Sequence, residues 1–275
     1  MTYHPFVRES SAPANGFDEA WLELLASSRT EGKRVASLAP AHSASNSGAE
    51  PLLSLYAPLC TARGFVLGHV GQSLDGQIAT QSGASRYITG VENLRHMHRL
   101  RALVDAVIVG ASTVEADDPL LTTRLVAGPS PVRVVIDPNL RLPLDRRLFR
   151  DKTVRTLVVC ADDTRANGHV GEVELVRVRR ENGALPPGGI VSALAELGLD
   201  RLLVEGGGIT VSRFLAARAL DRLHVTIGPL FVGSGKPGIV LPGVDSMDET
   251  WRPAARRFDL GADVLFDCSL KGPNV

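Results

Sequence analysis

The segment that decides how this chain is expected to fold is Leu202-Leu203-Val204-Glu205-Gly206-Gly207-Gly208-Ile209-Thr210. A short apolar run predicts a buried strand that ends on a carboxylate, and three glycines precede a helical pattern. A strand, a glycine turn and a helix start together present backbone N–H groups that can bind an anion at the carboxyl edge of a sheet. Glycines can also serve only to bend the chain, so both interpretations stay open here.

The chain beyond residue 60 repeats this alternation of strands and helices. Apolar runs predict strands at 65–70, 106–110, 132–136, 156–160, 201–204 and 223–227, and helical patterns fall near 91–104, 190–198 and 210–219. This order predicts an α/β fold whose central sheet is mostly parallel, with helices on both faces. Residues 263–270 largely alternate between apolar and polar, which indicates an antiparallel C-terminal edge strand.

Residues 1–60 have a different character and are expected to form an N-terminal extension. Phe17 to Ser28 could form one amphipathic helix, and residues 35–50 are rich in alanine, serine and glycine, which is typical of a flexible linker. Residues 61–275 then form the main domain.

Composition excludes several classes of protein. Lys+Arg and Asp+Glu are 30 each in 275 residues, so the formal net charge is zero and no long-range attraction to nucleic acid or an anionic membrane is expected. No apolar run reaches the roughly 18 residues that a membrane span needs, and the N-terminus has no apolar segment typical of a secretion signal. The three cysteines are far apart, which fits a reducing compartment. We therefore expect a cytoplasmic protein. His96 and His98 point to different helix faces, and no metal site is expected.

Four predicted strands deliver glycine, hydroxyl or acidic residues to their carboxyl ends. Gly71 and Asp75 follow the first strand, Thr113 follows the second, Asp137 the third, and Glu205 the one quoted above. Asp75 could simply form an Asp-Gly turn and Thr113 could cap a helix, but four such ends together suggest one cleft.

Two arginines near this edge have the geometry that phosphate prefers. Arg101 lies on the helix before the second strand, and Arg124 follows a Leu-Thr-Thr run. A guanidinium offers a planar fork of donors that matches a phosphate, although a single arginine is more often a solvated surface group.

The motifs together resemble a known family. Their order is Ser73-Leu74-Asp75-Gly76, Ser82-Gly83-Ala84-Ser85, His98-Arg99-Leu100-Arg101-Ala102, the run from Val109 to Arg124, Pro131 to Asp137, and Val204 to Gly208. This set resembles the pyrimidine reductases of riboflavin biosynthesis, which are the C-terminal domain of a bifunctional deaminase/reductase and its stand-alone relatives. The resemblance covers roughly residues 64–270, and it implies that 61–275 is a reductase domain with a dihydrofolate-reductase-like fold and that the protein is a homodimer.

The resemblance also implies an activity. Members use NADPH to reduce the ribosyl group of a 5-phosphoribosylamino pyrimidine to a ribityl chain, by hydride transfer to the sugar C1′ of a ring-opened imine. The expected ligands are thus NADPH and a small phosphorylated pyrimidine, either deaminated or still carrying both amino groups. Residues 1–63 contain no His-x-Glu and no Pro-Cys-x-x-Cys, so deaminase chemistry is not expected.

Site residues follow from the same resemblance, position by position. Those matching cofactor contacts are Gly71, Tyr87, Thr113, Asp117, Gly207, Gly208, Ile209 and Thr210. Those matching substrate contacts are Ser85, Arg101, Leu121, Arg124 and Glu205. Opening the ribose ring needs proton transfer, and Asp75 and Glu205 are both candidates for this catalytic work. The chain departs from many members in having His69 in place of a lysine and Tyr87 in place of a tryptophan.

Two alternatives remain at this point. One is an NADPH reductase of a different heterocycle, such as a pterin, on the same fold, and the other is a non-catalytic NADP-binding sensor. Convergence of Arg101 and Arg124 on one anion would favour a phosphorylated substrate. The presence of Asp75, Glu205 and both arginines argues against a sensor, which would need only the dinucleotide half.

Overall fold

In the computed structural model, the described residues are 16–28, 50–165 and 173–271. The chain divides after Thr61 into two compact units. The first unit contains α1 (Gly16–Ser27), where the sequence predicted a helix, and α2 (Glu50–Thr61), which was not predicted. Most of the predicted linker lies outside the described residues. Within this unit the rings of Trp21 and Tyr56 meet edge to face, with centroids 5.4 Å apart.

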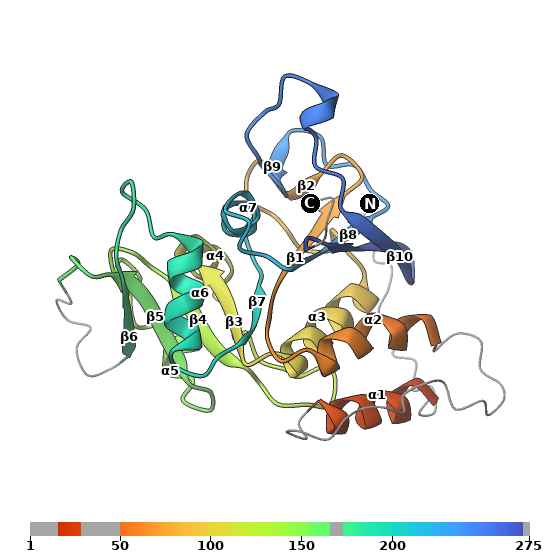
Figure 1. Ribbon diagram of the computed structural model, residues 1–275, viewed down its shortest axis with the longest axis horizontal. Helices are drawn as coiled ribbons and strands as arrows, with labels where there is room; N and C mark the ends of the chain where they lie inside the picture. The colour runs from red at the N-terminus through yellow and green to blue at the C-terminus, as the bar shows by residue number, and fades with distance from the viewer. Residues whose placement is uncertain (1–15, 29–49, 166–172, 272–275) are drawn as a thin grey trace, which may run out of the picture. The chain divides into compact units, whose positions relative to one another are not determined.

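The second unit is built on a nine-stranded sheet with the order β10-β11-β8-β1-β7-β3-β4-β5-β6. In Figure 1 these strands follow one another from β6 on the left to β8 on the right. From β6 to β8 every neighbouring pair is parallel, which confirms the predicted fold class. The strands are β1 (Phe65–Ser73), β3 (Ala106–Gly110), β4 (Val132–Ile136), β5 (Thr156–Ala161), β6 (Glu174–Val178), β7 (Arg201–Val204), β8 (Arg222–Gly228), β10 (Ala254–Leu260) and β11 (Asp263–Ser269).

The antiparallel edge of this sheet contains two strands. β11, which the sequence predicted as the edge strand, pairs antiparallel with β8 on one side and with β10 on the other. β10 is therefore outermost, and its first four residues are exposed. A small second sheet pairs β2 (Gln77–Thr80) with β9 (Gly235–Pro237).

Helices cover both faces of the large sheet. One face packs against α6 (Pro187–Ala195) and α7 (Gly208–Ala216) in a single hydrophobic cluster that includes Ile108, Val204 and Phe214. Side chains alternate along a strand, so the residues between those cluster members face the opposite side of the sheet. α3 (Val91–Leu103) lies on that opposite side, where its Arg101 donates a hydrogen bond to Glu205. We call this second side the α3 face. The remaining helices are α4 (Ala111–Asp117), α5 (Arg147–Arg150) and a 3-10 turn η1 (Met247–Glu249).

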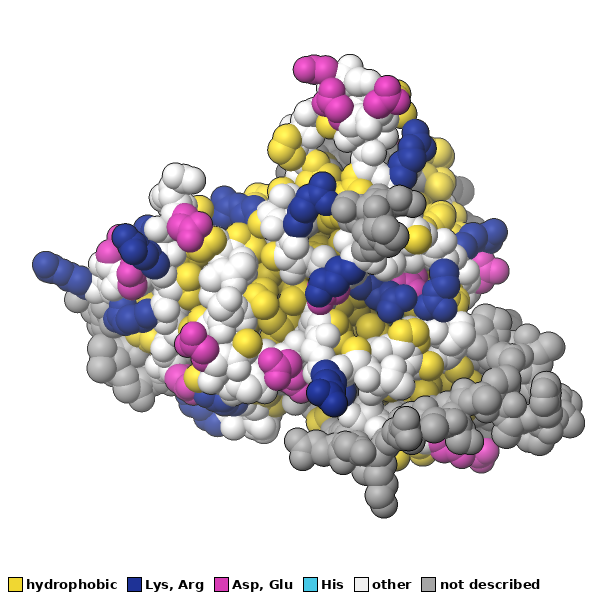
Figure 2. All heavy atoms as spheres, viewed as in Figure 1, with side chains coloured by type: hydrophobic (Ala, Val, Ile, Leu, Met, Phe, Trp, Pro, Cys, Tyr) yellow, Lys and Arg dark blue, Asp and Glu magenta, His cyan; other side chains and the backbone are white. Residues whose placement is uncertain are grey.

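Surface charge follows the balanced composition. On the face seen in Figure 2, basic and acidic side chains lie in several separate groups with hydrophobic and neutral atoms between them. Among the described residues, no helix is both long and apolar enough to cross a membrane.

Three histidines are buried on the α3 face. His69 of β1, His96 of α3 and His224 of β8 are 4%, 0% and 0% exposed. The His96 Nε2 lies 3.1 Å from the His224 Nδ1, and the His69 Nε2 lies 3.1 Å from the Asn93 Oδ1. Burial, followed by the charge of His224, lowers the pKa of His69 to about 3. Burial also lowers the pKa of His96 and His224, so the folded protein holds these rings neutral.

Folding stability should therefore decrease in mild acid. The unfolded chain binds a proton to His69 near pH 6.5, whereas the folded chain does so only near pH 3. The stabilisation that neutral His69 contributes is therefore fully present above pH 6.5 and is lost as the pH falls from 6.5 toward 3. Below pH 6.5 the stabilisation from His69 falls by about 1.4 kcal/mol for each pH unit, down to a pH of about 3. Urea unfolding at several pH values between 7.5 and 5 measures this. His69→Gln should give a shallower pH profile, and parallel profiles for the two proteins would contradict the explanation.

Candidate active site

The glycine turn after β7 is shaped by contacts within the protein. Gly206 has a φ of +94°, which side-chain-bearing residues rarely adopt, and a Cβ there would lie 2.9 Å from the Thr113 side chain. The Gly207 N–H donates to the Thr113 Oγ1 over 2.9 Å. Thr113 lies on α4, the helix that follows the neighbouring strand β3, and it holds the turn from there.

The start of α7 leaves donors for a ligand. The Thr210 N–H donates to the Gly207 carbonyl, while the N–H groups of Gly208 and Ile209 belong to the first helical turn, which has no intrahelical acceptors. The Ile209 side chain is 65% exposed. Ile209 is thus exposed at the start of α7, whereas Gly208 is buried, and a Cβ on Gly208 would lie 2.5 Å from the carbonyl oxygens of Pro237 and Gly238.

Glu205, the carboxylate at the end of β7, forms a buried ion pair with Arg101. The Arg101 Nη2 donates to one oxygen over 2.6 Å and the Nε donates to the other over 3.2 Å. The third nitrogen, Nη1, donates to the Thr122 carbonyl over 3.2 Å. The side chains of Arg101 and Glu205 are 11% and 4% exposed, so the pair is largely shielded from water. The two residues are 104 positions apart, and the sequence alone did not pair them.

A cavity of about 370 Å³ opens beside this ion pair. It brings together four of the predicted site residues, Arg101, Asp117, Leu121 and Arg124. The rest of its wall is Asp118, Pro119, Leu120 and Arg147. Leu121 has a φ of +56° and is 2% exposed, a strained conformation for a branched side chain that often marks a functional site. Arg101 and Arg124 therefore line one cavity, although the side-chain nitrogens of Arg101 already donate to Glu205 and to the Thr122 carbonyl.

Electrostatics around Arg124 reflect the crowding of positive charge. Burial, then the charges of Arg101 and Arg147, lower the pKa of the Arg124 guanidinium. The Arg124 backbone N–H donates to the His98 Nδ1 over 3.0 Å. Burial, followed by the charges of Arg101 and Arg124, lowers the pKa of His98 to about 4. His98 is therefore a neutral acceptor that positions the Arg124 backbone.

Asp75 has a different environment from Glu205. Its Oδ1 accepts from the Ser73 hydroxyl over 2.5 Å, and its Oδ2 accepts from the Gly233 N–H over 2.6 Å. The Val232 N–H also donates to it, over 3.1 Å. The Ser73 hydrogen bond, followed by the Val232 one, lowers the pKa of Asp75 to about 2. Asp75 is thus an ionised carboxylate that holds the loop before β9.

The other residues expected at the cofactor lie on β1 and the loop before α3. Gly71 lies within β1, and a Cβ there would lie 3.1 Å from the Thr89 side chain and 3.2 Å from that of Asn93. Tyr87 has a φ of +67° and a side chain that is 90% exposed, and Ser85 is exposed beside it. Neither lines the 370 Å³ cavity. His69, which replaces a lysine, is buried against Asn93.

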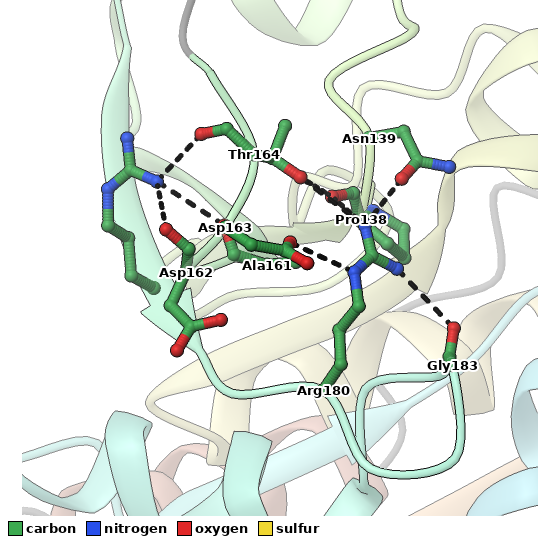
Figure 3. A network of polar contacts seen from close by, with 9 residues as sticks. Pro138, Asn139, Ala161, Asp162, Asp163, Thr164, Arg180 and Gly183 are labelled. Atoms are coloured by element: carbon green, nitrogen blue, oxygen red, sulfur yellow. Dashed lines mark hydrogen bonds and ion pairs between the residues drawn. The ribbon is translucent and has the colours of Figure 1, made fainter.

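A network of hydrogen bonds ties the carboxyl ends of β4, β5 and β6 (Figure 3). Arg180 donates through Nε to the Asp163 Oδ1 over 3.0 Å and through Nη2 to the Asn139 Oδ1 over 2.5 Å. Arg177 donates to three carbonyls, of which the nearest is that of Thr164 at 2.9 Å. The donors of these arginines serve to fix the loops.

Sequence reasoning did not predict four residues of the cavity wall, and two of these, Arg147 and Asp118, are charged. Arg147 lies on α5, a helix of four residues that is too short to show a periodic apolar pattern in the sequence. Asp118 ends α4 in a left-handed conformation with a φ of +40°, and its Oδ1 accepts from the Arg147 N–H over 2.9 Å. The Asp-Asp-Pro sequence marks the end of the helix, but the contact with Arg147 depends on tertiary structure.

Comparison with known proteins shows the family of the chain. The model of the RibD C-terminal domain matches residues 65–257. A 2,5-diamino-6-ribosylamino-4(3H)-pyrimidinone 5′-phosphate reductase from Methanothermobacter thermautotrophicus is 33% identical over 76% of this chain and 100% of its own length. The riboflavin biosynthesis protein RibD of Aquifex aeolicus is also 33% identical, over 70% of this chain, but the match spans only 54% of that protein.

Solved structures show the same fold. RibD from Acinetobacter baumannii superposes with a TM-score of 0.65 over 80% of this chain and 61% of that one, at 23% identity. The Saccharomyces cerevisiae riboflavin biosynthesis reductase Rib7 superposes with a TM-score of 0.61 over 75% of this chain and 89% of that one, at 21% identity. With the family model matching most of its length, the chain belongs to the RibD C-terminal domain family.

Proposed function

We propose that the protein is an NADPH-dependent reductase of a phosphorylated ribosylamino pyrimidine in riboflavin biosynthesis. The observation that carries this proposal is the cavity lined by Arg101 and Arg124, because it offers positive charge to an anion and Arg101 links its wall to the Glu205 carboxylate. The archaeal relative that this chain covers completely carries the name of such a reductase.

The residues present fit a dinucleotide at the glycine turn. The open N-terminus of α7 offers backbone donors to a pyrophosphate, and the Thr113 contact fixes their direction. The exposed Tyr87 ring is available to a flat heterocycle. NADPH, when bound, would supply the hydride that reduces the sugar C1′. A cytoplasmic location and a homodimer remain predictions from the sequence.

We infer distinct roles for the two candidate carboxylates. Glu205 is held by two hydrogen bonds from Arg101, one to each carboxylate oxygen, so it suits a fixed group that stabilises the positive charge of a substrate iminium. Asp75 has a pKa of about 2 and its two oxygens accept from Ser73 and from the loop before β9, which suits a loop anchor. This assignment is our proposal for the choice that sequence reasoning left open.

A substitution in the glycine turn should weaken cofactor binding. Gly206→Ala adds a methyl group to a residue with positive φ and places it 2.9 Å from Thr113, so the turn must shift. We expect roughly tenfold weaker NADPH binding, measured by the fluorescence of the bound nicotinamide. Gly183→Ala is the matched control, because its φ is +80° but no atom lies within 4 Å. It should lose about 1–2 kcal/mol of stability from backbone strain and keep its NADPH affinity. Equal NADPH affinities in the two variants would contradict this view of the turn.

The reaction itself is tested by following NADPH oxidation with each pyrimidine, deaminated and diamino, supplied separately. Turnover on one of them supports the proposal and identifies the substrate, whereas NADPH binding without turnover on either would favour another heterocycle or a sensor. Glu205→Gln removes the charge but keeps the size of the side chain, and we expect kcat to fall about 100-fold. Asp75→Asn should reduce kcat less. A larger loss in Asp75→Asn would reverse the two roles.

A further inference from the structure

Sequence analysis assigned no role to Arg147, the third arginine of the cavity. It lines the same cavity as Arg101 and Arg124, and the charges of Arg101 and Arg147 both act on the Arg124 guanidinium. Arg101 is neutralised by Glu205, with which it forms an ion pair at 2.6 Å. Within residues 50–165 and 173–271, no acidic side chain forms an ion pair with Arg124 or Arg147. Two guanidinium forks are therefore available to a ligand.

Other arginines of the domain are occupied by the protein itself. Arg180 and Arg177 hold the loops at the carboxyl ends of β4 to β6, and Arg133 donates to Asp151 and to two carbonyls. These side chains have structural acceptors and need no ligand. The free donors of Arg124 and Arg147 are different because they share a concave wall with each other, where like charges repel unless an anion lies between them.

The backbone of Arg147 is held in place, although its side chain is exposed. Its backbone N–H donates to the Asp118 Oδ1 over 2.9 Å, which joins α5 to the end of α4. The next two residues, Leu148 and Phe149, are 0% and 4% exposed and anchor α5 in the core. The Arg147 side chain thus extends into the cavity rim from a backbone position that is already ordered, which lowers the entropy cost of binding a ligand.

The cavity wall also contains acceptors. Asp117 and Asp118 lie in it beside the arginines, so the cavity is not purely a site for anions. Carboxylates accept hydrogen bonds from hydroxyl groups, and guanidinium groups donate to phosphate oxygens. A ligand with both a phosphate and sugar hydroxyls matches this mixed wall better than inorganic phosphate or an unphosphorylated sugar does.

We propose that Arg147 is a specificity-determining residue that, with Arg124, binds the phosphate of a phosphorylated sugar in this cavity. The inference rests on the proposed function, for which it identifies the part of the substrate that the cavity selects. Arg147 belongs to substrate recognition and takes no part in hydride or proton transfer.

The test compares Arg147→Gln with Arg150→Gln in the full chain. Arg150 lies on the same helix, is exposed and does not line the cavity, so its variant removes the same charge from nearby. Calorimetric titration with ribose 5-phosphate should show roughly tenfold or greater loss of affinity in Arg147→Gln and less than about twofold change in Arg150→Gln. Titration with ribose should show no dependence on either arginine. Equal losses of ribose 5-phosphate affinity in the two variants would mean that only overall charge matters, and would overturn the proposal.

Kinetics separate this inference from the proposed reaction. With the pyrimidine that is turned over, Arg147→Gln should raise KM by a similar factor and leave kcat within about twofold. Turnover with an unchanged KM in Arg147→Gln would overturn the role of Arg147 while the proposed function stands. If neither pyrimidine is turned over but ribose 5-phosphate binding still depends on Arg147, the reaction is wrong and the phosphosugar site stands. Unchanged NADPH affinity and melting temperature in each variant establish that the fold is intact.

Discussion

The arrangement of the site depends on the buried ion pair between Arg101 and Glu205. It joins α3 to the carboxyl end of β7, and it does so on the face of the sheet opposite α7. Removing one partner of a buried pair leaves an uncompensated charge, typically at a cost of about 3–5 kcal/mol. The pair therefore holds the Arg101 side chain at the wall of the cavity and fixes the position of the Glu205 carboxylate behind it.

Much of the fold could be predicted from the sequence because parallel strands buried on both faces are continuous apolar runs. All five residues of β3 are buried, and the run that predicted this strand has the same bounds. β6 and β10 were not predicted, since they lie toward the two ends of the sheet and mix exposed polar residues with few buried ones. The sequence also did not predict the strand order at this end of the sheet. It predicted β11 as the edge strand, whereas β10 pairs with the outer side of β11.

The site was predictable only in part, for a related reason. Local patterns gave the glycine turn and the residue types at strand ends, and family resemblance supplied Arg101 and Glu205 as separate contacts. Their pairing spans 104 positions, and no local pattern encodes it. The same holds for Arg147, which enters the cavity through a hydrogen bond from its backbone to Asp118. For Asp75, its partners Val232 and Gly233 lie 157 and 158 positions away, and they change its inferred role.

The glycine turn shows how the same residues can satisfy both interpretations that the sequence left open. Gly206 bends the chain at positive φ and avoids Thr113, which is a structural reason for glycine. The Gly207 N–H is then used by Thr113, so the turn is held by contacts within the protein. Under the proposed function, a dinucleotide at the start of α7 would meet a turn that is already ordered, and binding need not also order the loop. Bending the chain and binding an anion would then be two consequences of one local geometry.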